Sequence, residues 1–233
     1  MRRALRVTGT VLIGAGVLGL VWVVVVWQWE DPFTALYTTW KQHELAQSLD
    51  RQLATYKPTR VKANDLAAER TAIAADAKRY RRQARAGQAI GRIVIGRIGL
   101  DMVLVNGTDH GSLEKGPGRD ARSFMPGQNR LVYIAGHRTT YLAPFSHIDA
   151  IKTGDSIRLE MPYATFVYRA TGHRVVTASD LSVLRSPTHE ELRLQACHPR
   201  FFATHRYIVD AKLVSVQPRN GTPYTVVAAA PLG

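Results

Sequence analysis

The sequence predicts a mainly β domain, a closed barrel or a sandwich, that follows an N-terminal membrane-spanning helix and a helical stalk. Three observations predict this arrangement. An uncharged apolar run lies near the N-terminus, an alanine-rich polar region follows it, and short segments rich in Val, Ile, Tyr and Thr fill most of the remainder. The chain has 233 residues, 45% of them hydrophobic, which is enough for one packed domain and an appendage.

The run from Val7 to Trp27 carries no charge and is long enough for a helix to cross a hydrocarbon layer of about 30 Å. Arginines precede it, and Glu30 and Asp31 follow it, so the positive-inside rule predicts a cytoplasmic N-terminus and an extracytoplasmic remainder. A cleavable signal peptide is the alternative, but its apolar region is expected to span about 7–15 residues and to end at small residues, which are missing after Trp27. We therefore expect residues 1–29 to form a cytoplasmic tip and a single-pass anchor in the cell membrane.

Residues 30–87 are expected to form an extracytoplasmic helical stalk or linker. Between Ala35 and about Arg85, apolar residues recur every three or four positions, which predicts helices interrupted near Lys57-Pro58. Because Ala dominates over Leu and Ile, these helices are expected to bury little bulky hydrocarbon and to hold the next domain away from the bilayer. Packing on that domain, self-association and a position on the membrane surface remain open.

Residues 88–220 are expected to form the β domain. Runs of β-branched and aromatic residues lie between Gly, Pro, Asn and Asp; they are 89–96, 101–107, 129–136, 155–161, 165–176, 191–197 and 206–216. With few helical segments between them, a closed barrel or a sandwich is favoured over a parallel α/β sheet. One short helix is expected at Ser112-Leu113 or at 143–148. Residues 221–233 show no pattern that would pair with a strand and are expected to be a flexible tail.

The net charge of +13 is spread along the chain. An extracytoplasmic location excludes nucleic acid as the expected partner. Anionic membrane lipid and envelope polymers would be attracted over about a Debye length, roughly 8 Å at physiological salt. A solvated surface without a partner is the simpler alternative.

The single cysteine, Cys197, has no second cysteine with which to form a disulfide. Period-two alternation places Leu192, Leu194 and Ala196 on one face of a strand and Cys197 on the other. Pro199 cannot continue a central strand, so Cys197 is expected at the strand end, where reactive groups often lie. Taken alone, a free cysteine is more often a small core residue than a nucleophile.

Two further residues could serve a nucleophilic thiol. If residues 198–205 form the loop of an antiparallel hairpin, Arg206 lies near Cys197 and stabilises its thiolate. A plain exposed strand residue is the alternative for this arginine. His137 follows a predicted strand that ends at Ala135-Gly136, so it too is placed at a strand end, where it can exchange protons with a nucleophile.

These residues together resemble a sortase. The stretches "WEDPFTALYTTW", "GPG" at 116–118, "MPGQ" at 125–128, "AGHRTTYLAPF" and "CHPRF" are similar in order and spacing to actinobacterial class E sortases over residues 29–216. The resemblance implies a closed sortase-type β-barrel of about eight strands. The sequence departs from the family pattern at Gln195-Ala196, where two threonines commonly precede the cysteine, and at Arg119-Asp120, where His-Tyr is usual.

The resemblance also implies a cysteine transpeptidase with His137, Cys197 and Arg206 as catalytic residues. Cys197 would attack the carbonyl after Thr in an LPXTG-like or LAXTG-like C-terminal sorting signal of a surface protein and form a thioester. Arg206 would donate to the oxyanion, and His137 would protonate the departing amine. An amine of a lipid II-like peptidoglycan precursor would resolve the acyl-enzyme. Ala135 and Ala196 are expected to leave a substrate groove open, covered by a loop near 138–149.

Other interpretations are weighed against this one. A zinc site at Cys197, His198 and His205 is disfavoured because structural sites take four ligands and prefer several cysteines. Acidic residues are too few and too mixed with basic ones for a calcium site, so no metal and no cofactor are expected. An L,D-transpeptidase-like enzyme usually has Ser-x-Gly-Cys, whereas Leu-Gln-Ala-Cys stands here. A non-enzymatic envelope-binding β domain remains the third alternative.

Overall fold

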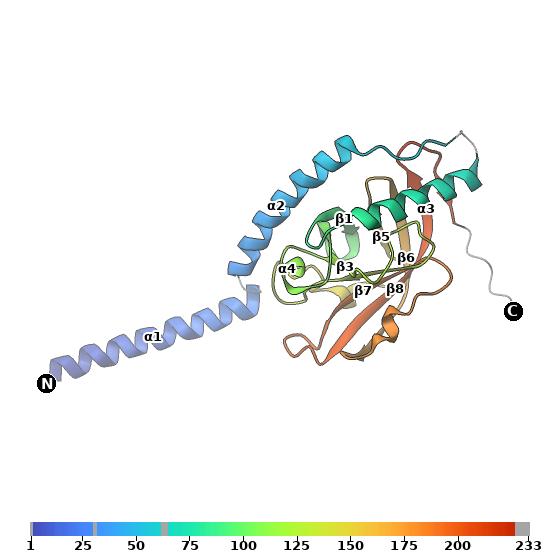
Figure 1. Cartoon of the computed structure of the whole chain (residues 1–233). Coiled ribbons are helices and arrows are strands. Elements are labelled where there is room, and N and C mark those ends of the chain that lie inside the picture. The colour runs from blue at the N-terminus through green and yellow to red at the C-terminus, as the bar shows by residue number, and fades with distance from the viewer. Residues whose placement is uncertain (1, 30–31, 62–64, 227–233) are drawn as a thin grey trace.

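A closed ring of strands lies at the centre of the molecule (Figure 1). In this computed structural model, which describes residues 2–29, 32–61 and 65–226, eight of the described strands follow the order β6-β5-β1-β2-β3-β4-β7-β8, and pairing of β6 with β8 closes the ring. Their bounds are β1 Ala89–Ile95, β2 Leu100–Asn106, β3 Gly118–Arg119, β4 Leu131–Ala135, β5 Ser156–Glu160, β6 Ala164–Thr177, β7 Glu191–His198 and β8 His205–Pro218. The prediction of a closed barrel of about eight strands is confirmed.

All the strands predicted from sequence are present, but two short strands were missed, β3 and the C-terminal β9, Tyr224–Thr225. The two residues of β3 pair in parallel with β2 and antiparallel with β4. A strand this short, beginning with glycine, has no pattern of alternation or propensity that a sequence can reveal. Long-range pairing alone creates β3.

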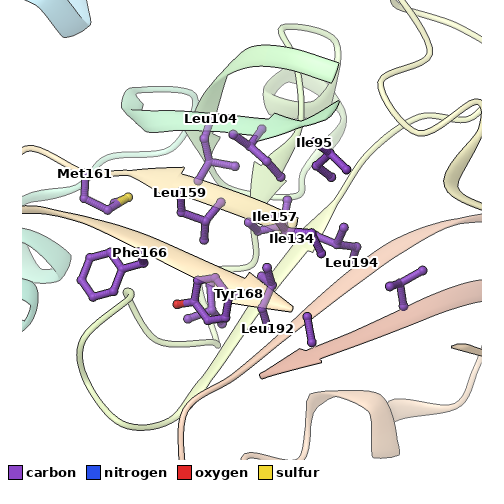
Figure 2. Packing of buried hydrophobic residues seen from close by; sticks show 14 of the residues in the cluster. Ile95, Leu104, Ile134, Ile157, Leu159, Met161, Phe166, Tyr168, Leu192 and Leu194 are labelled. Carbon is purple, nitrogen blue, oxygen red and sulfur yellow. The ribbon is translucent and has the colours of Figure 1, made fainter. Parts of the chain in front are cut away.

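The interior of the barrel is filled by alternate residues of the strands. Ile134 of β4 and Leu192 and Leu194 of β7 are fully buried and meet Tyr168 of β6 there, as Figure 2 shows. The alternation that predicted Leu192, Leu194 and Ala196 on the core face is confirmed, because Ala196 belongs to the same cluster. Residues between these positions point to the outer face of the barrel.

The N-terminal helix α1, Arg2–Trp29, contains the predicted apolar segment. Within the described residues it is the one helix long and apolar enough to cross a membrane, over Arg2–Val24, and none of its most apolar window is buried. A membrane anchor and a signal sequence both satisfy these criteria of length and composition. The predicted helix is therefore confirmed.

Helices α2, Pro32–Thr55, and α3, Leu66–Gln83, confirm the break expected near Lys57-Pro58. They do not form a free spacer: α3 crosses the barrel and α2 runs along it (Figure 1). Leu45 of α2 packs in a cluster with Val103 and Val105, and Tyr80 of α3 belongs to the main core.

The predicted helical region is confirmed, and its few buried large side chains, Leu45, Leu49, Ile73 and Tyr80, lie against the barrel. Other large side chains of these helices, such as Leu36, Trp40 and Leu66, are exposed, and the abundant small alanines allow the helices to approach the barrel. Polar contacts add to this packing, since the Tyr80 hydroxyl donates to Gln52 Oε1 at 3.0 Å. Of the alternatives considered, packing on the β domain is the one that the structure adopts.

The short helix α4, His110–Leu113, forms where Ser112-Leu113 predicted it. Asp109 caps it by accepting a hydrogen bond from Ser112 N at 3.1 Å. In the second candidate segment, 143–148, only Ile148 is helical, as the first residue of the 3-10 turn η2, Ile148–Ala150. Two further 3-10 turns are η1, Gly96–Ile98, and η3, Leu181–Leu184.

Part of the predicted tail is ordered against the barrel. A short strand β9, Tyr224–Thr225, pairs with β8, and Val226 N donates to Val214 O at 2.8 Å. The expectation that 221–233 contains no paired strand is wrong at these positions, because two residues are too few to show a pattern in sequence. Residues 227–233 lie outside the described residues.

Candidate active site

Cys197 lies near the end of β7, on the outer face of the barrel. It pairs directly with Arg206 of β8 in the antiparallel register, and the hairpin loop begins after His198. The thiol is half-buried, unlike its neighbour Ala196, whose side chain is 1% exposed within the core. The predicted hairpin, the predicted strand end and the predicted outward orientation of the cysteine are confirmed.

His137 reaches the same edge of the sheet through a parallel pairing. Strand β4 runs parallel to β7, with Ala135 opposite Gln195, and Gly136 N extends the pairing by donating to Gln195 O at 3.0 Å. His137 follows Ala135 by two residues, and Cys197 follows Gln195 by the same number. Parallel neighbours that advance together bring residues of equal offset side by side at one end of a sheet.

The chain turns sharply at Gly136 because the loop that follows folds back under it. Phe145 N donates to His137 O at 3.0 Å, and a Cβ on Gly136 would lie only 2.7 Å from the buried Phe145 ring. A larger residue at 136 would therefore displace the histidine. This close approach explains the glycine of the "AGHR" stretch.

Burial lowers the pKa of the His137 imidazole below its ordinary value; the charge of His110 lowers it further, and the carboxylate of Glu114 opposes both. The Nε2 atom of His137 is buried and has no hydrogen-bond partner among the described residues. The ring packs against Tyr141, with 5.1 Å between ring centroids. A buried nitrogen without a partner can exchange a proton with a bound reactant.

Arg206 brings a positive charge to the opposite side of Cys197. Its guanidinium donates to the carbonyl oxygens of Ala203, at 2.7 Å, and His205, at 2.9 Å, in the hairpin loop. Over residues 2–29, 32–61 and 65–226, no carboxylate forms an ion pair with it. This charge therefore stays available to stabilise a thiolate or an oxyanion.

Arg138 was missed by the sequence reasoning, although it is the best-buried cation at this edge. Its guanidinium donates to Cys197 O at 3.3 Å, contacts His198 Nδ1 at 3.0 Å and forms a 2.9 Å ion pair with Asp149. Its side chain is only 4% exposed. Arg138 thereby joins the end of β7 to the loop after β4. Its place directly after His137 was the only sequence signal, and it does not reveal burial.

The outer face between β4 and β7 is lined by Tyr133 and Gln195, whose hydroxyl and amide oxygen are hydrogen bonded. Ala135 lies on the same face and is 4% exposed. Ala196 points into the core, so a substrate could meet only its backbone. As substrate-binding residues, Ala135 and Ala196 remain predictions.

The departure from the family pattern at Arg119-Asp120 has a structural consequence. Arg119 is buried and donates to Asn106 Oδ1 at 2.6 Å and to Ser123 O at 2.6 Å. Burial lowers the pKa of Arg119 to about 10, so it is still charged at neutral pH. Asp120 forms a 2.7 Å ion pair with Arg122. This ion pair lies close enough to Tyr133 for both of its charges to act on the pKa of that phenol, which burial raises.

A cavity of about 540 Å³ lies at the other end of β7 and contains none of the three predicted catalytic residues. It is lined by Arg70, Glu190, Leu213 and Tyr224, among others. The carboxylate in its wall is occupied, since Glu190 accepts from Gly127 N and Asn129 N. The three predicted catalytic residues lie at the opposite end of β7, where Cys197 pairs with Arg206 and where β4 leads to His137.

Groups of three or more His, Cys, Asp or Glu side chains that could hold a metal ion do not occur in the part of the chain that the structure describes. The zinc alternative at Cys197, His198 and His205 therefore has no supporting geometry. The arrangement fits nucleophilic catalysis, in which a thiol, a proton-exchanging histidine and an anion-stabilising arginine converge.

Known proteins show the same combination of fold and sequence. The Sortase domain family matches residues 93–214. Sortase D of Bacillus subtilis is 34% identical over 133 residues, which are 55% of this chain and 66% of that protein. Sortase SrtE1 of Streptomyces coelicolor is 33% identical over 105 residues, 41% of this chain and 30% of that protein. The chain thus spans at most about two thirds of the length of these relatives.

Solved structures agree with this assignment. The sortase D5 transpeptidase of Clostridium perfringens has a TM-score of 0.61 and 25% identity, covering 75% of this chain and 98% of that one. The sortase E1 structure from Streptomyces coelicolor, which has a tripeptide in its active site, has a TM-score of 0.54 and 27% identity, covering 58% and 94%. The relatives include the class E sortases that the sequence resembles. This chain belongs to the sortase family.

Proposed function

We propose that this chain is a membrane-anchored cysteine transpeptidase that attaches surface proteins to a cell-wall amine. The single observation that carries the proposal is the pairing of Cys197 with Arg206 at the strand end to which β4 also delivers His137. The half-buried thiol, the unpartnered imidazole nitrogen and the guanidinium without a carboxylate partner supply the three functions that acyl transfer needs.

In the first half-reaction the Cys197 thiolate attacks the carbonyl carbon after Thr in an LPXTG-like or LAXTG-like sorting signal. Arg206 donates to the resulting oxyanion. The C–N bond then breaks, His137 gives its proton to the departing amine, and a thioester remains on Cys197. In the second half-reaction the incoming amine attacks the thioester and gives a proton to His137; the new C–N bond forms, the C–S bond breaks, and the Cys197 thiolate is released.

The acceptor that we propose is an amine of a lipid II-like peptidoglycan precursor. The apolar helix α1 supports a single-pass anchor with a cytoplasmic N-terminus, in contact with membrane lipid, and an extracytoplasmic barrel. The loop at 138–149 lies directly after His137, where it can shield a thioester from water. The reaction requires no cofactor, since each proton and bond change is assigned to a side chain of the chain.

The test is cleavage of fluorogenic LPXTG and LAXTG peptides by the full chain in detergent, with mass spectrometry of the intact protein. The wild type is expected to accumulate an acyl adduct on Cys197. Cys197→Ala is expected to lose all cleavage while keeping its melting temperature. Normal cleavage by that variant would refute the assignment. If a peptidyl vinyl sulfone failed to label the wild-type thiol at neutral pH, the envelope-binding alternative would be favoured instead.

A further inference from the structure

A second polar group lies behind His137, on the side away from the barrel core. The Tyr141 ring packs on the imidazole at 5.1 Å with 36° between the ring planes, and its hydroxyl donates to Glu114 Oε1 at 2.9 Å. The same oxygen lies 3.0 Å from Nε2 of the exposed His110. The Glu114 side chain is 24% exposed, so part of its charge is shielded from solvent. The sequence analysis gave none of these three residues a role.

Helix α2 is hydrogen bonded to both Tyr141 and Glu114. Thr34 Oγ1 accepts a hydrogen bond from Tyr141 N at 3.0 Å, and Thr38 Oγ1 donates to Glu114 O at 2.8 Å. Thr38 is fully buried in this contact. One turn further on, Gln42 Nε2 donates to Lys115 O at 2.7 Å. Hydroxyls and an amide of one helix face thus clamp the two segments that carry Glu114 and Tyr141.

The backbone around Tyr141 needs such support. Tyr141, Leu142 and Ala143 have φ angles of 54°, 60° and 38°, in the left-handed region that residues with a Cβ rarely adopt. Consecutive residues in this region persist only where the surrounding structure fixes them. The contacts of Tyr141 with Thr34 and Glu114 fix the first of these three residues, Tyr141 itself.

We propose that Glu114 is a positioning residue for His137, acting through the Tyr141 ring, and that the first turns of α2 hold this pair in place. A third group that orients the base is a common feature of nucleophilic sites. The inference rests on the proposed transpeptidase function and assigns part of its active-site support to the helix nearest the proposed membrane anchor. It also gives a role to the "TALYTTW" stretch and to the tyrosine of "AGHRTTY".

Charge contributes to the same effect. The Glu114 carboxylate favours the imidazolium form of His137, in opposition to burial and to His110, which lower the pKa of the ring. The other ionisable residues nearby are Tyr141, whose ring packs on the imidazole, and Cys197 of β7 and Arg206 of β8 at the neighbouring strand ends. Their charges are the same in wild type and Glu114 variants, so a difference between the two reports Glu114.

The first experiment compares Glu114→Gln, Tyr141→Phe and the double variant in the full chain. Each single variant is expected to lower kcat about tenfold with little change in KM, and the double variant is expected to be no worse than the poorer single, because both act through one contact. Additive losses, or unchanged kcat in both single variants, would overturn the proposal. Tyr141→Ala, which also removes the ring contact, is expected to be worse than Tyr141→Phe.

An NMR titration of His137 in the Cys197→Ala background provides a readout that needs no turnover. Glu114→Gln is expected to lower the pKa of His137, whereas Glu114→Asp is expected to restore part of the shift. An unchanged pKa in Glu114→Gln would contradict the proposal. Because this titration uses no substrate, it can support or refute the positioning role even if the wild type cleaves no sorting peptide, which would refute only the proposed function.

The α2 clamp has a matched control on the same helix. Thr38→Val removes a donor to Glu114 O, and Thr34→Val removes the acceptor for Tyr141 N; each is expected to lower kcat about threefold to tenfold. Thr39→Val is the control, because Thr39 is exposed and its hydroxyl donates to Ala35 O of its own helix. Equal kcat in all three variants would exclude a role for α2 at the active site.

Discussion

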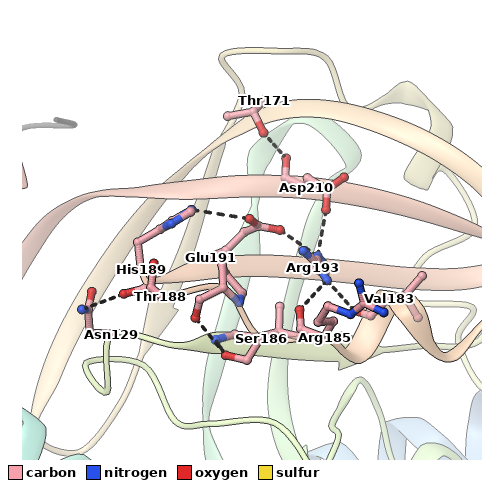
Figure 3. A network of polar contacts seen from close by, with 12 residues as sticks. Asn129, Thr171, Val183, Arg185, Ser186, Thr188, His189, Glu191, Arg193 and Asp210 are labelled. Carbon is pink, nitrogen blue, oxygen red and sulfur yellow. Dashed lines mark hydrogen bonds and ion pairs between the residues drawn. The ribbon is translucent and has the colours of Figure 1, made fainter. Parts of the chain in front are cut away.

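The two ends of the outer face of β7 differ in how well their polar groups are satisfied. At the start of the strand, Arg193 donates to Glu191 Oε1 at 2.7 Å, to Asp210 Oδ1 at 3.1 Å and to two backbone carbonyls, as Figure 3 shows. At its end, Cys197 is half-buried near two side-chain nitrogen atoms that lack a hydrogen bond among the described residues. His137 Nε2 and Arg138 Nε are the buried side-chain polar atoms without a hydrogen bond within the described residues, and both lie at this end.

Glu190, just before β7, makes the contrast sharper. Its buried carboxylate accepts from Gly127 N at 2.9 Å, from Asn129 N at 3.0 Å and from the Tyr168 hydroxyl at 2.6 Å. Burial raises the pKa of Glu190, and these three donors oppose that shift. Where folding alone is at stake, buried polar atoms are satisfied within the protein. Within the described residues, the unsatisfied buried side-chain atoms therefore lie at the end of β7 where we propose that a substrate binds.

The largest effect is expected from Arg206, which lies opposite Cys197 at the end of β7. Arg206→Ala removes the donor to the oxyanion, so kcat/KM for a sorting peptide should fall by about 10²–10³-fold with an unchanged melting temperature. Arg130→Ala is the matched control, because Arg130 is exposed at the opposite end of β4. Equal losses of activity in Arg206→Ala and Arg130→Ala would contradict the expected difference in function between the two ends of the sheet.

The next largest effect is expected on stability, at the start of β7, where the buried polar groups are hydrogen bonded. Glu190→Gln replaces an acceptor oxygen with an amide group that faces backbone donors, so the free energy of unfolding should fall by about 1–3 kcal/mol. Urea unfolding followed by tryptophan fluorescence measures this change, and kcat well below the melting temperature should be unaffected. A variant as stable as the wild type would show that the contacts of Glu190 contribute little.

A smaller effect concerns the pH dependence of stability. Because the pKa of His137 is lower in the folded protein than its ordinary value of 6.5, the unfolded state holds more protons between these two values. The free energy of unfolding should therefore rise with pH through this window. In His137→Asn this contribution is absent, so the difference between the two stability curves should grow as the pH rises. Parallel curves would mean that burial does not perturb the histidine.

The smallest effect is expected from Asp149→Asn, which weakens the tether of Arg138 to the loop. The Asp149 side chain is 52% exposed, so the loss should be below about 1 kcal/mol. Arg138 keeps its donation to Cys197 O, and kcat should change by less than the effect of Arg206→Ala. A large loss of kcat with unchanged stability would indicate that the ion pair, and not the backbone contact, fixes the end of β7.

Much of the site follows from local sequence pattern. Alternation along 191–197 predicts the outward cysteine, Pro199 predicts the strand end, and the hairpin places Arg206 opposite Cys197. The motifs also led to His137. The roles of Arg138, Tyr141 and Glu114 were not predictable, because their burial and partners depend on a loop with left-handed residues and on helix α2. The packing of α2 and α3 was left open by the sequence, since few large residues determine it.

The sequence alone determined the periodicities of this protein: an apolar N-terminal helix, two polar helices, the alternating strands and a thiol on the outward face of one of them. These features depend on residues near one another in the chain, which is why short windows reveal them. The tertiary structure alone decided that β4 lies parallel to β7, that β3 and β9 exist, and that α2 contacts the segments that carry Glu114 and Tyr141. Each of these depends on contacts between segments distant in sequence, whose register is set by the packing of the whole barrel and not by any local preference.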